Sequence, residues 1–115
     1  MVFDFTLTEM GNKAVFGLGG NLVDKSQALG LVEKAEELAK KGCIKWAIDL
    51  ENLIYMNSSG LNTLIQLLTK ARVAGGEAVL FNLNKKINEL IIITKLHTLF
   101  KVAGTREEAI EALGD

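Results

Sequence analysis

The sequence of 115 residues has no proline, one cysteine and one histidine, and each scarcity excludes something. Because Cys43 is the only cysteine, no internal disulfide can form, which fits a reducing compartment. One cysteine and one histidine, His97, cannot supply a closed metal site without several carboxylates, so we expect no metal and no cofactor. Without proline, the ends of helices and strands must be predicted from glycines, capping residues and changes of hydrophobic period.

Basic stripes and long apolar runs are also missing. The formal net charge is -1 and the pI is near 5.8, which argues against nucleic-acid binding. Apolar runs such as Leu90–Ile93 are far too short to cross a bilayer. The N-terminal segment MVFDFTLTEM alternates and carries acids, unlike a secretory signal peptide. We therefore expect a cytoplasmic protein without membrane insertion.

Apolar residues make up 49% of the chain and charged residues 23%, enough for a packed core. Phe3, Phe5 and Leu7 alternate with polar residues, as in a half-buried strand, and a turn at residues 10–12 leads into a second strand. We expect Gly17, Gly19 and Gly20 to end that second strand in a bulge. The expected strands are residues 3–7, 14–18, 44–50, 78–81 and 99–102.

Four segments have helical spacing, each after a capping residue. They are residues 28–39 after the pair Asp24 and Gln27, residues 61–71 after Asn57 or Ser58, residues 87–94 after Asn84, and a last helix burying Ala109, Ile110 and Leu113 after the pair Thr105 and Glu108. The faces that contain Leu31, Ile65 and Leu90 are expected to cover the sheet. Alternating strands and helices indicate a single α/β domain, residues 1–115, with parallel pairing wherever a helix crosses over.

The stretch YMNSSGLNTL, residues 55–64, allows three interpretations. Asn57 or Ser58 can simply cap the following helix. A catalytic serine would need the pattern G-x-S-x-G, but Met56 or Asn57 stands where the first glycine belongs, and a triad of Ser58, His97 and an acid has little support. The third interpretation is a serine that another protein modifies.

The glycine-rich segment at residues 17–20 is a weaker candidate site. It lacks the Gly-Lys-Ser/Thr ending of a phosphate loop and the three-glycine dinucleotide fingerprint.

The segment AIDLENLIYMNSSGLNTLIQLLTKARVAGG, residues 47–76, resembles the signature of STAS domains, the sulphate-transporter and anti-sigma-factor-antagonist family. Those domains typically have an apolar strand, D-L, a few further residues, then M-D-S-S/T-G-L-G and a helix ending in G-G. GGNLVD and KLHTLFKV are similar to flanking family segments, so the resemblance covers nearly the whole chain. It implies an α/β fold with a small mixed β-sheet packed with about four α-helices.

By resemblance, the protein would be an anti-sigma factor antagonist and not an enzyme. Stand-alone members bind an anti-sigma factor that is also a serine kinase, which frees the sigma factor. The kinase phosphorylates the first serine after the family's aspartate, and a serine phosphatase reverses this. The resemblance places phosphorylation on Ser58, with Ser59 as second choice. It places the partner-binding surface on Asn57, Ser58, Ser59, Gly60, Leu61, Asn62, Leu22 and Asp24.

Three positions depart from the family pattern. Asn57 stands where an acid is usual, Asn62 stands where the second glycine is usual, and Val23 replaces an acid, although Asp24 follows it. Two other roles stay open: an accessory subunit of a lipid-transport ABC complex or of a stress-signalling assembly, without phosphorylation, and, remotely, a serine hydrolase acting through Ser58.

Overall fold

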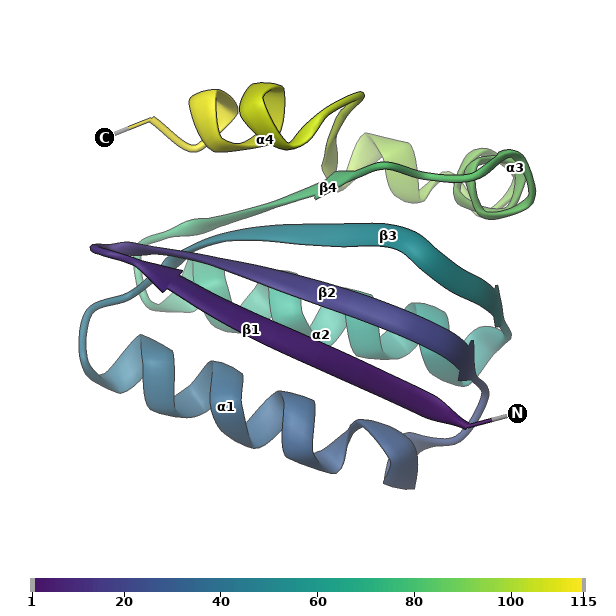
Figure 1. Ribbon diagram of the computed structural model, residues 1–115, viewed down its shortest axis with the longest axis horizontal. Coiled ribbons are helices and arrows are strands. Elements are labelled where there is room, and N and C mark those ends of the chain that lie inside the picture. The colour runs from purple at the N-terminus through teal and green to yellow at the C-terminus, as the bar shows by residue number, and fades with distance from the viewer. Residues whose placement is uncertain (1, 115) are drawn as a thin grey trace.

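The computed structural model describes residues 2–114, which form a five-stranded mixed sheet with four α-helices (Figure 1). The strands are β1 (Phe3–Met10), β2 (Lys13–Leu22), β3 (Lys45–Met56), β4 (Glu77–Phe81) and β5 (Lys101–Ala103), and they lie in that order in the sheet. Only the hairpin of β1 and β2 is antiparallel. The helices are α1 (Leu29–Lys40), α2 (Ser58–Val73), α3 (Lys85–Ile93) and α4 (Arg106–Ala112), with 3-10 turns η1 (Lys25–Ala28) and η2 (Leu96–Thr98). The predicted fold class is confirmed.

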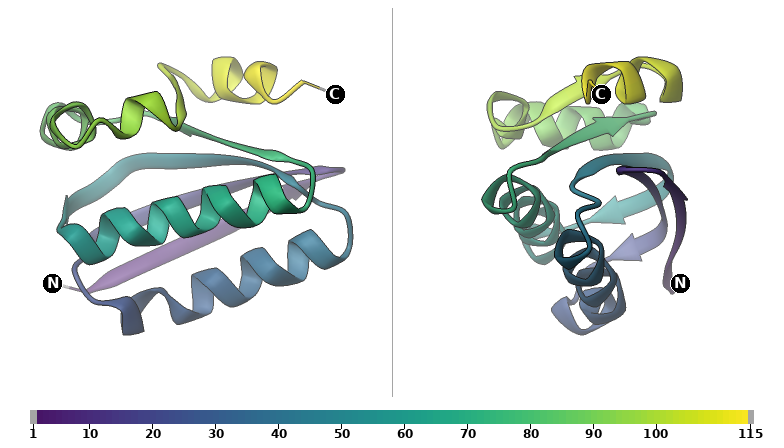
Figure 2. Two further views of the ribbon diagram at one scale, coloured as in Figure 1. Left: turned by 180° about the vertical axis from the view of Figure 1, so that it is seen from behind. Right: turned by 90° about the vertical axis from the view of Figure 1, so that its left-hand side faces the viewer.

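Side chains that alternate along the strands divide the core between the two faces of the sheet. Helices α1 and α2 lie side by side on one face, over the larger core, which includes Phe16, Trp46 and Leu67 (Figure 2). Helix α4 covers the other face near β4, where Val79 and Phe81 belong to a smaller core.

The strands β2 and β3 run further than predicted. The glycines at positions 17, 19 and 20 do not end β2, because β2 pairs with β1 on one side and with β3 on the other. Their effect is local: the register shifts between Gly17 and Gly19 and again after Gly20, so the bulge is confirmed but lies within the strand. Pairing of Leu22 with Met56 carries β3 six residues beyond the predicted end at Leu50, up to the start of α2.

Other ends differ by smaller amounts. β1 continues to Met10 instead of ending at Leu7, because its pairing with β2 extends to the turn, and β5 covers Lys101–Ala103 instead of residues 99–102. The capping pair of Asp24 and Gln27 is present, but it begins the turn η1, and α1 follows at Leu29.

The buried face of α2 is also wider than predicted. Leu64, Leu67 and Ala71 have no exposed surface, whereas Ile65, which was predicted to belong to the face that covers the sheet, is half-buried at its flank. The difference arises because α2 packs on two strands and on α1 at once.

Candidate functional site

The passage from β3 into α2 is fixed by Asn57. Its backbone is extended, its Oδ1 accepts a hydrogen bond from the Gly60 N–H at 3.2 Å, and its carbonyl accepts the first helical bond from Leu61 at 3.0 Å. Asn57 is therefore the N-cap, one of the two residues that the sequence offered for this role, and the other, Ser58, begins α2 three residues before the expected start at Leu61.

The other half of the Asn57 amide joins the helix to a distant turn. Its Nδ2 donates to the Val23 carbonyl at 2.9 Å, and its backbone N–H points to the Leu22 carbonyl at 3.4 Å. The turn after β2 thus lies against the first turn of α2, and Asp24 is held there by its capping box with Gln27. An aspartate at position 57 could accept from Gly60 but could not donate to Val23.

We expect the two halves of this amide to be separable by mutation. Asn57→Ala removes the cap and the link to Val23 and should lower the free energy of unfolding by about 1–2 kcal/mol. Asn57→Asp keeps the acceptor and gains about 0.3–1 kcal/mol from the helix dipole, which offsets part of the lost donor. In urea denaturation, the free energy of unfolding should decrease from the wild type to Asn57→Asp and again to Asn57→Ala. An alanine variant as stable as the aspartate variant would contradict this role.

Gly60 allows α2 to approach the strands closely. A Cβ at this position would lie 2.5 Å from the Leu22 carbonyl oxygen and 2.6 Å from the Met56 Cβ. Neither atom is the end of a flexible side chain, so any other residue would push the helix start away from β2 and β3.

A matched pair of glycine substitutions tests this contact. Gly60→Ala should destabilise the protein by about 1–2 kcal/mol, because overpacking outweighs the helix preference of alanine. Gly30→Ala, in the first turn of α1, meets only the Phe5 ring at 3.6 Å and should stabilise by up to about 1 kcal/mol. The measurement is the thermal unfolding midpoint of each variant. Equal shifts of both variants would show that the approach of α2 to Leu22 is not tight.

The predicted partner-binding residues lie together in the structure, but not all of their side chains are exposed. Exposed or half-exposed side chains come from Asp24, Asn57, Ser58, Ser59, Leu61 and Asn62, which we call the α2 surface. Leu22 and Gly60 are buried beneath it, so they position the surface without adding side-chain area. Beside it, a hollow of about 260 Å³ is lined by Lys25, Ser59, Asn62, Thr63 and Gln66. Lys25 and Gln66 were missed because only the fold places them next to the serines.

Ser58 is the most accessible hydroxyl of the motif. It is exposed, and within residues 2–114 its Oγ makes no hydrogen bond, while the N–H groups of Ser58 and Ser59 find no acceptor. The first turn of α2 carries no acidic residue, so the positive end of the helix dipole is not neutralised there. Ser59 is half-buried, and Thr63 is 3% exposed and donates its hydroxyl to the Ser59 carbonyl at 3.1 Å.

The remaining chemical candidates lie elsewhere. His97 is exposed in η2, and across residues 2–114 no hydrogen bond links it to Ser58. Burial raises the pKa of the Cys43 thiol, which keeps it protonated and weakly nucleophilic at neutral pH. In the described part of the chain no group of three His, Cys, Asp or Glu residues could hold a metal ion. The segment at residues 17–20 lies inside β2.

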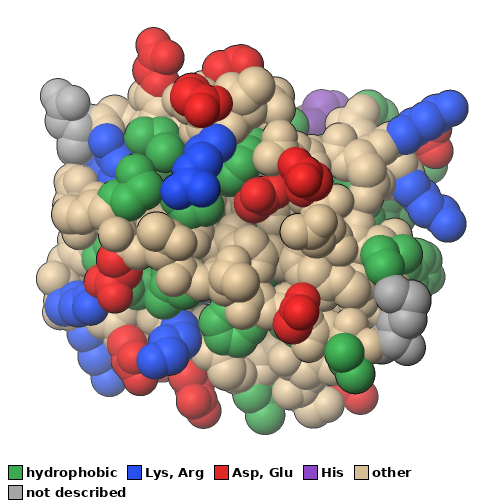
Figure 3. Space-filling model, in the orientation of Figure 1, with side chains coloured by type: hydrophobic (Ala, Val, Ile, Leu, Met, Phe, Trp, Pro, Cys, Tyr) green, Lys and Arg blue, Asp and Glu red, His purple; other side chains and the backbone are tan. Residues whose placement is uncertain are grey.

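Two surface properties bear on partners. Acidic and basic side chains are interspersed on the face seen in Figure 3, with no continuous basic patch there. Of the helices within residues 2–114, none has the length and apolar character needed to span a membrane.

Comparison with known proteins gives consistent matches. A family model for the STAS domain matches residues 7–109. BtrV of Bordetella bronchiseptica, named as an anti-sigma factor antagonist, is 30% identical over 91 residues, which cover 79% of this chain and 78% of BtrV.

Solved structures show the same fold. The TM1081 structure, from a Thermotoga maritima protein named as an anti-sigma factor antagonist, has a TM-score of 0.84 at 20% identity, covering 96% of this chain and 88% of that one. The anti-sigma factor antagonist SpoIIAA, unphosphorylated, has a TM-score of 0.78 at 22% identity, covering 95% of both chains. Since the family model spans most of the chain and agrees with the fold, the protein belongs to the STAS domain family.

Proposed function

We propose that the protein is an anti-sigma factor antagonist whose α2 surface binds an anti-sigma factor that is also a serine kinase. Binding would free the sigma factor, phosphorylation of Ser58 would end the binding, and a serine phosphatase would restore it. The name of BtrV supports the general role. The observation that carries the switch is Ser58 itself: exposed, unbonded and first in α2, within the motif that resembles the family signature. This role would be performed in the cytoplasm and needs no catalysis by the protein.

The position of Ser58 suits a modification that leaves the fold intact. A phosphate there would add about 1.5–2 negative charges next to free backbone N–H groups and the positive end of a helix. The isolated protein should therefore accept it without unfolding. SpoIIAA, which shares this fold, has been solved in a phosphorylated form, with a TM-score of 0.73 at 22% identity. A phosphate is thus compatible with a protein of this architecture.

The same charge would act differently in a complex. In the free protein water solvates the phosphate, but in a contact surface it loses that water, which costs free energy unless a basic group pairs with it. A partner surface that is apolar or acidic supplies no such basic group. A hundredfold loss of affinity requires only about 2.7 kcal/mol.

Burial separates the possible acceptor hydroxyls. A kinase must place the hydroxyl in its own active site, and Ser58 can be reached without moving α2. Ser59 is half-buried, and Thr63 is buried with its hydroxyl bonded to the backbone, so each would need the first turn to open. We therefore propose Ser58 as the first acceptor and Ser59 as the second.

The acceptor can be tested with the kinase partner. Neighbouring gene products are captured with the tagged protein, and the captured ATP-binding partner is incubated with it and ATP. Mass spectrometry should place one phosphate on Ser58, and Ser58→Ala should abolish it. Phosphate found only on Thr63, or capture of a transporter ATPase instead of a kinase, would contradict the proposal. Asn57→Asp adds a check on the missing acid, since a faster reaction would mean that the kinase uses it.

A further inference from the structure

The edge of the sheet at β1 is long and open. Within residues 2–114, β1 pairs with β2 alone, so one side of its backbone has no neighbouring strand. In Figure 1 β1 lies in front of β2, and no helix or strand lies in front of β1. Figure 2 shows it at the outer margin of the sheet, with α1 on the helix-covered face and not beyond the strand. The backbone groups along this edge are therefore accessible to another strand.

Only alternate residues of β1 form hydrogen bonds with β2. The Val2 carbonyl accepts a hydrogen bond from the Asn21 N–H at 3.4 Å, and the pairing keeps the same register up to Met10 with Lys13. In an antiparallel pair, hydrogen-bonded residues alternate with residues whose N–H and C=O groups point away from the neighbouring strand. The residues whose backbone groups point outward are therefore Phe3, Phe5, Leu7 and Glu9. Across the described residues, nothing bonds to the backbone groups on that side.

Edge strands are commonly protected from pairing with other chains by lysine or proline in the strand, by a bulge, or by a covering helix. The sequence of β1, FDFTLTEM, has no basic residue and no proline, and its pairing with β2 has no register shift. Of its two acidic residues, Glu9 pairs with the Lys41 ammonium at 2.7 Å. Asp4 alone offers a weak protection, so this edge is suited to pairing with a further strand.

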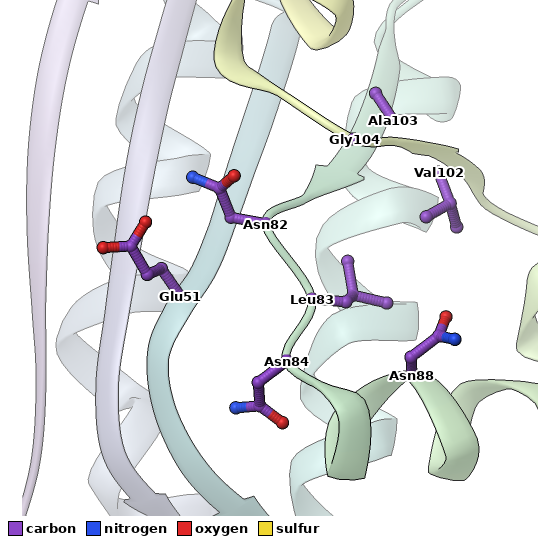
Figure 4. Close-up of a pocket in the computed structure, with 8 residues that line it drawn as sticks. All are labelled: Glu51, Asn82, Leu83, Asn84, Asn88, Val102, Ala103 and Gly104. Atoms are coloured by element: carbon purple, nitrogen blue, oxygen red, sulfur yellow. The ribbon is translucent and has the colours of Figure 1, made fainter.

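The opposite edge of the sheet is short and protected. β5 spans only Lys101–Ala103 and carries a lysine. An open hollow of about 500 Å³ lies at its end, lined by side chains that include Glu51, Asn82 and Val102 (Figure 4). Pairing of β1 with β5 of the next copy would give an open-ended filament, whereas pairing of β1 with β1 closes as a two-fold dimer. The lengths of the two edges favour the dimer.

Two-fold symmetry restricts how two β1 strands can pair. Outward-pointing residues must lie opposite one another, so that each pair exchanges both of its backbone hydrogen bonds. A register centred on Thr6 uses all four outward residues, with Phe3 opposite Glu9 and Phe5 opposite Leu7. A register centred on Phe5 or Leu7 leaves one of the four without a partner. The register centred on Thr6 therefore forms the most backbone hydrogen bonds.

The side chains of β1 fit that register. On the helix-covered face, Phe5 of one copy would pack against Leu7 of the other, and both side chains are only half-buried in the single chain. On the open face, Thr6 would lie opposite Thr6, and Asp4 would lie opposite Thr8. Paired threonines are favourable in antiparallel sheets, and no acid lies directly opposite another acid.

We propose that the protein forms a dimer in which the β1 strands of two copies pair in antiparallel orientation about a two-fold axis at Thr6. The two sheets then form one continuous sheet, with α1 and α2 of both copies on the same face. No residue of the α2 surface belongs to β1, so this proposal does not depend on the switch at Ser58.

Sedimentation equilibrium of the untagged protein can measure the dimer dissociation constant, and amide hydrogen exchange can locate the interface. As the protein concentration rises, the N–H groups of Phe5, Leu7 and Glu9 are expected to become protected, because they gain acceptors from the second copy. The N–H groups of Thr6 and Thr8 already point to β2 in the single chain. They are the internal control and should change little.

Two substitutions of exposed threonines test the register. Thr6→Asp places two carboxylates opposite each other at the axis, beside Asp4, and should weaken dimerisation about fivefold. Thr8→Lys places an ammonium opposite Asp4 of the second copy and should strengthen dimerisation about fivefold. Misfolding could cause a loss of affinity but not a gain, so the opposite signs distinguish a charge effect from damage to the fold.

Several results would overturn the proposal. These are a monomer at every concentration up to the millimolar range, a dimer without added protection at Phe5 and Leu7, and changes of the same sign for Thr6→Asp and Thr8→Lys. Protection that appears only after the anti-sigma factor kinase is added would assign this edge to a strand of that partner, and would also overturn pairing between two copies.

Discussion

Replacing Trp46 with alanine is expected to lower the free energy of unfolding by about 3–5 kcal/mol, a large part of the total for a domain of this size. Trp46 has no exposed surface and is the second residue of β3. Its ring meets Phe16 of β2 edge to face, with centroids 5.7 Å apart. Its Nε1 donates to the Cys43 carbonyl at 2.9 Å. Alanine would leave a cavity between the sheet and the helices and an unsatisfied buried carbonyl.

The two parts of that loss can be separated with Trp46→Phe. Phenylalanine keeps an aromatic contact with Phe16 but cannot donate to Cys43, so it should cost less than alanine and more than a surface substitution. Urea unfolding followed by circular dichroism gives both values without relying on tryptophan fluorescence. A loss below about 1 kcal/mol for Trp46→Ala would contradict the packing described for this core.

Much of the fold could be predicted because its signals are local. Asn84 and Thr105 were predicted as helix caps, and Asn57 as one of two candidates with Ser58; each of Asn57, Asn84 and Thr105 accepts a hydrogen bond from the first turn of its helix. Capping depends on a side chain and a backbone N–H only two or three residues away, so the sequence carries the whole signal. The order of strands and helices follows for the same reason, from changes in hydrophobic period.

The features that sequence reasoning missed depend on partners far along the chain. The end of β3 at Met56 is set by pairing with Leu22, and the full burial of Leu67 is set by contacts of α2 with the sheet and α1. The bond from Asn57 to Val23 spans 34 residues. No local pattern in the sequence records such differences.

In the candidate site, too, the local motif could be predicted from the sequence, but the features that depend on distant contacts could not. Its serines and glycine were found from the motif, but their roles differ once burial is known. Gly60 and Leu22 are buried beneath the α2 surface and position it, while Ser58 presents an accessible hydroxyl on it. Because Asn57 is the cap and the Ser58 hydroxyl is unbonded, the free energy of unfolding of Ser58→Ala should lie within about 0.5 kcal/mol of wild type.

Phosphorylation of Ser58 is expected to weaken partner binding by about a hundredfold or more, equivalent to about 2.7 kcal/mol. Ser58→Asp should reproduce part of this effect, since it adds one charge instead of about two. Both modified proteins should unfold at or slightly above the wild-type midpoint, because a negative charge at the start of α2 is favourable. Weak binding caused by misfolding would instead lower that midpoint, so the two explanations can be told apart.

The most direct measurement is calorimetric titration of the anti-sigma factor kinase with the protein, unphosphorylated and fully phosphorylated, using Ser58→Ala as the control. We predict equal affinity for the unphosphorylated protein and Ser58→Ala, and an affinity about a hundredfold lower after phosphorylation, with the fold unchanged by circular dichroism. Equal binding of the phosphorylated and unphosphorylated proteins would contradict the switch at Ser58.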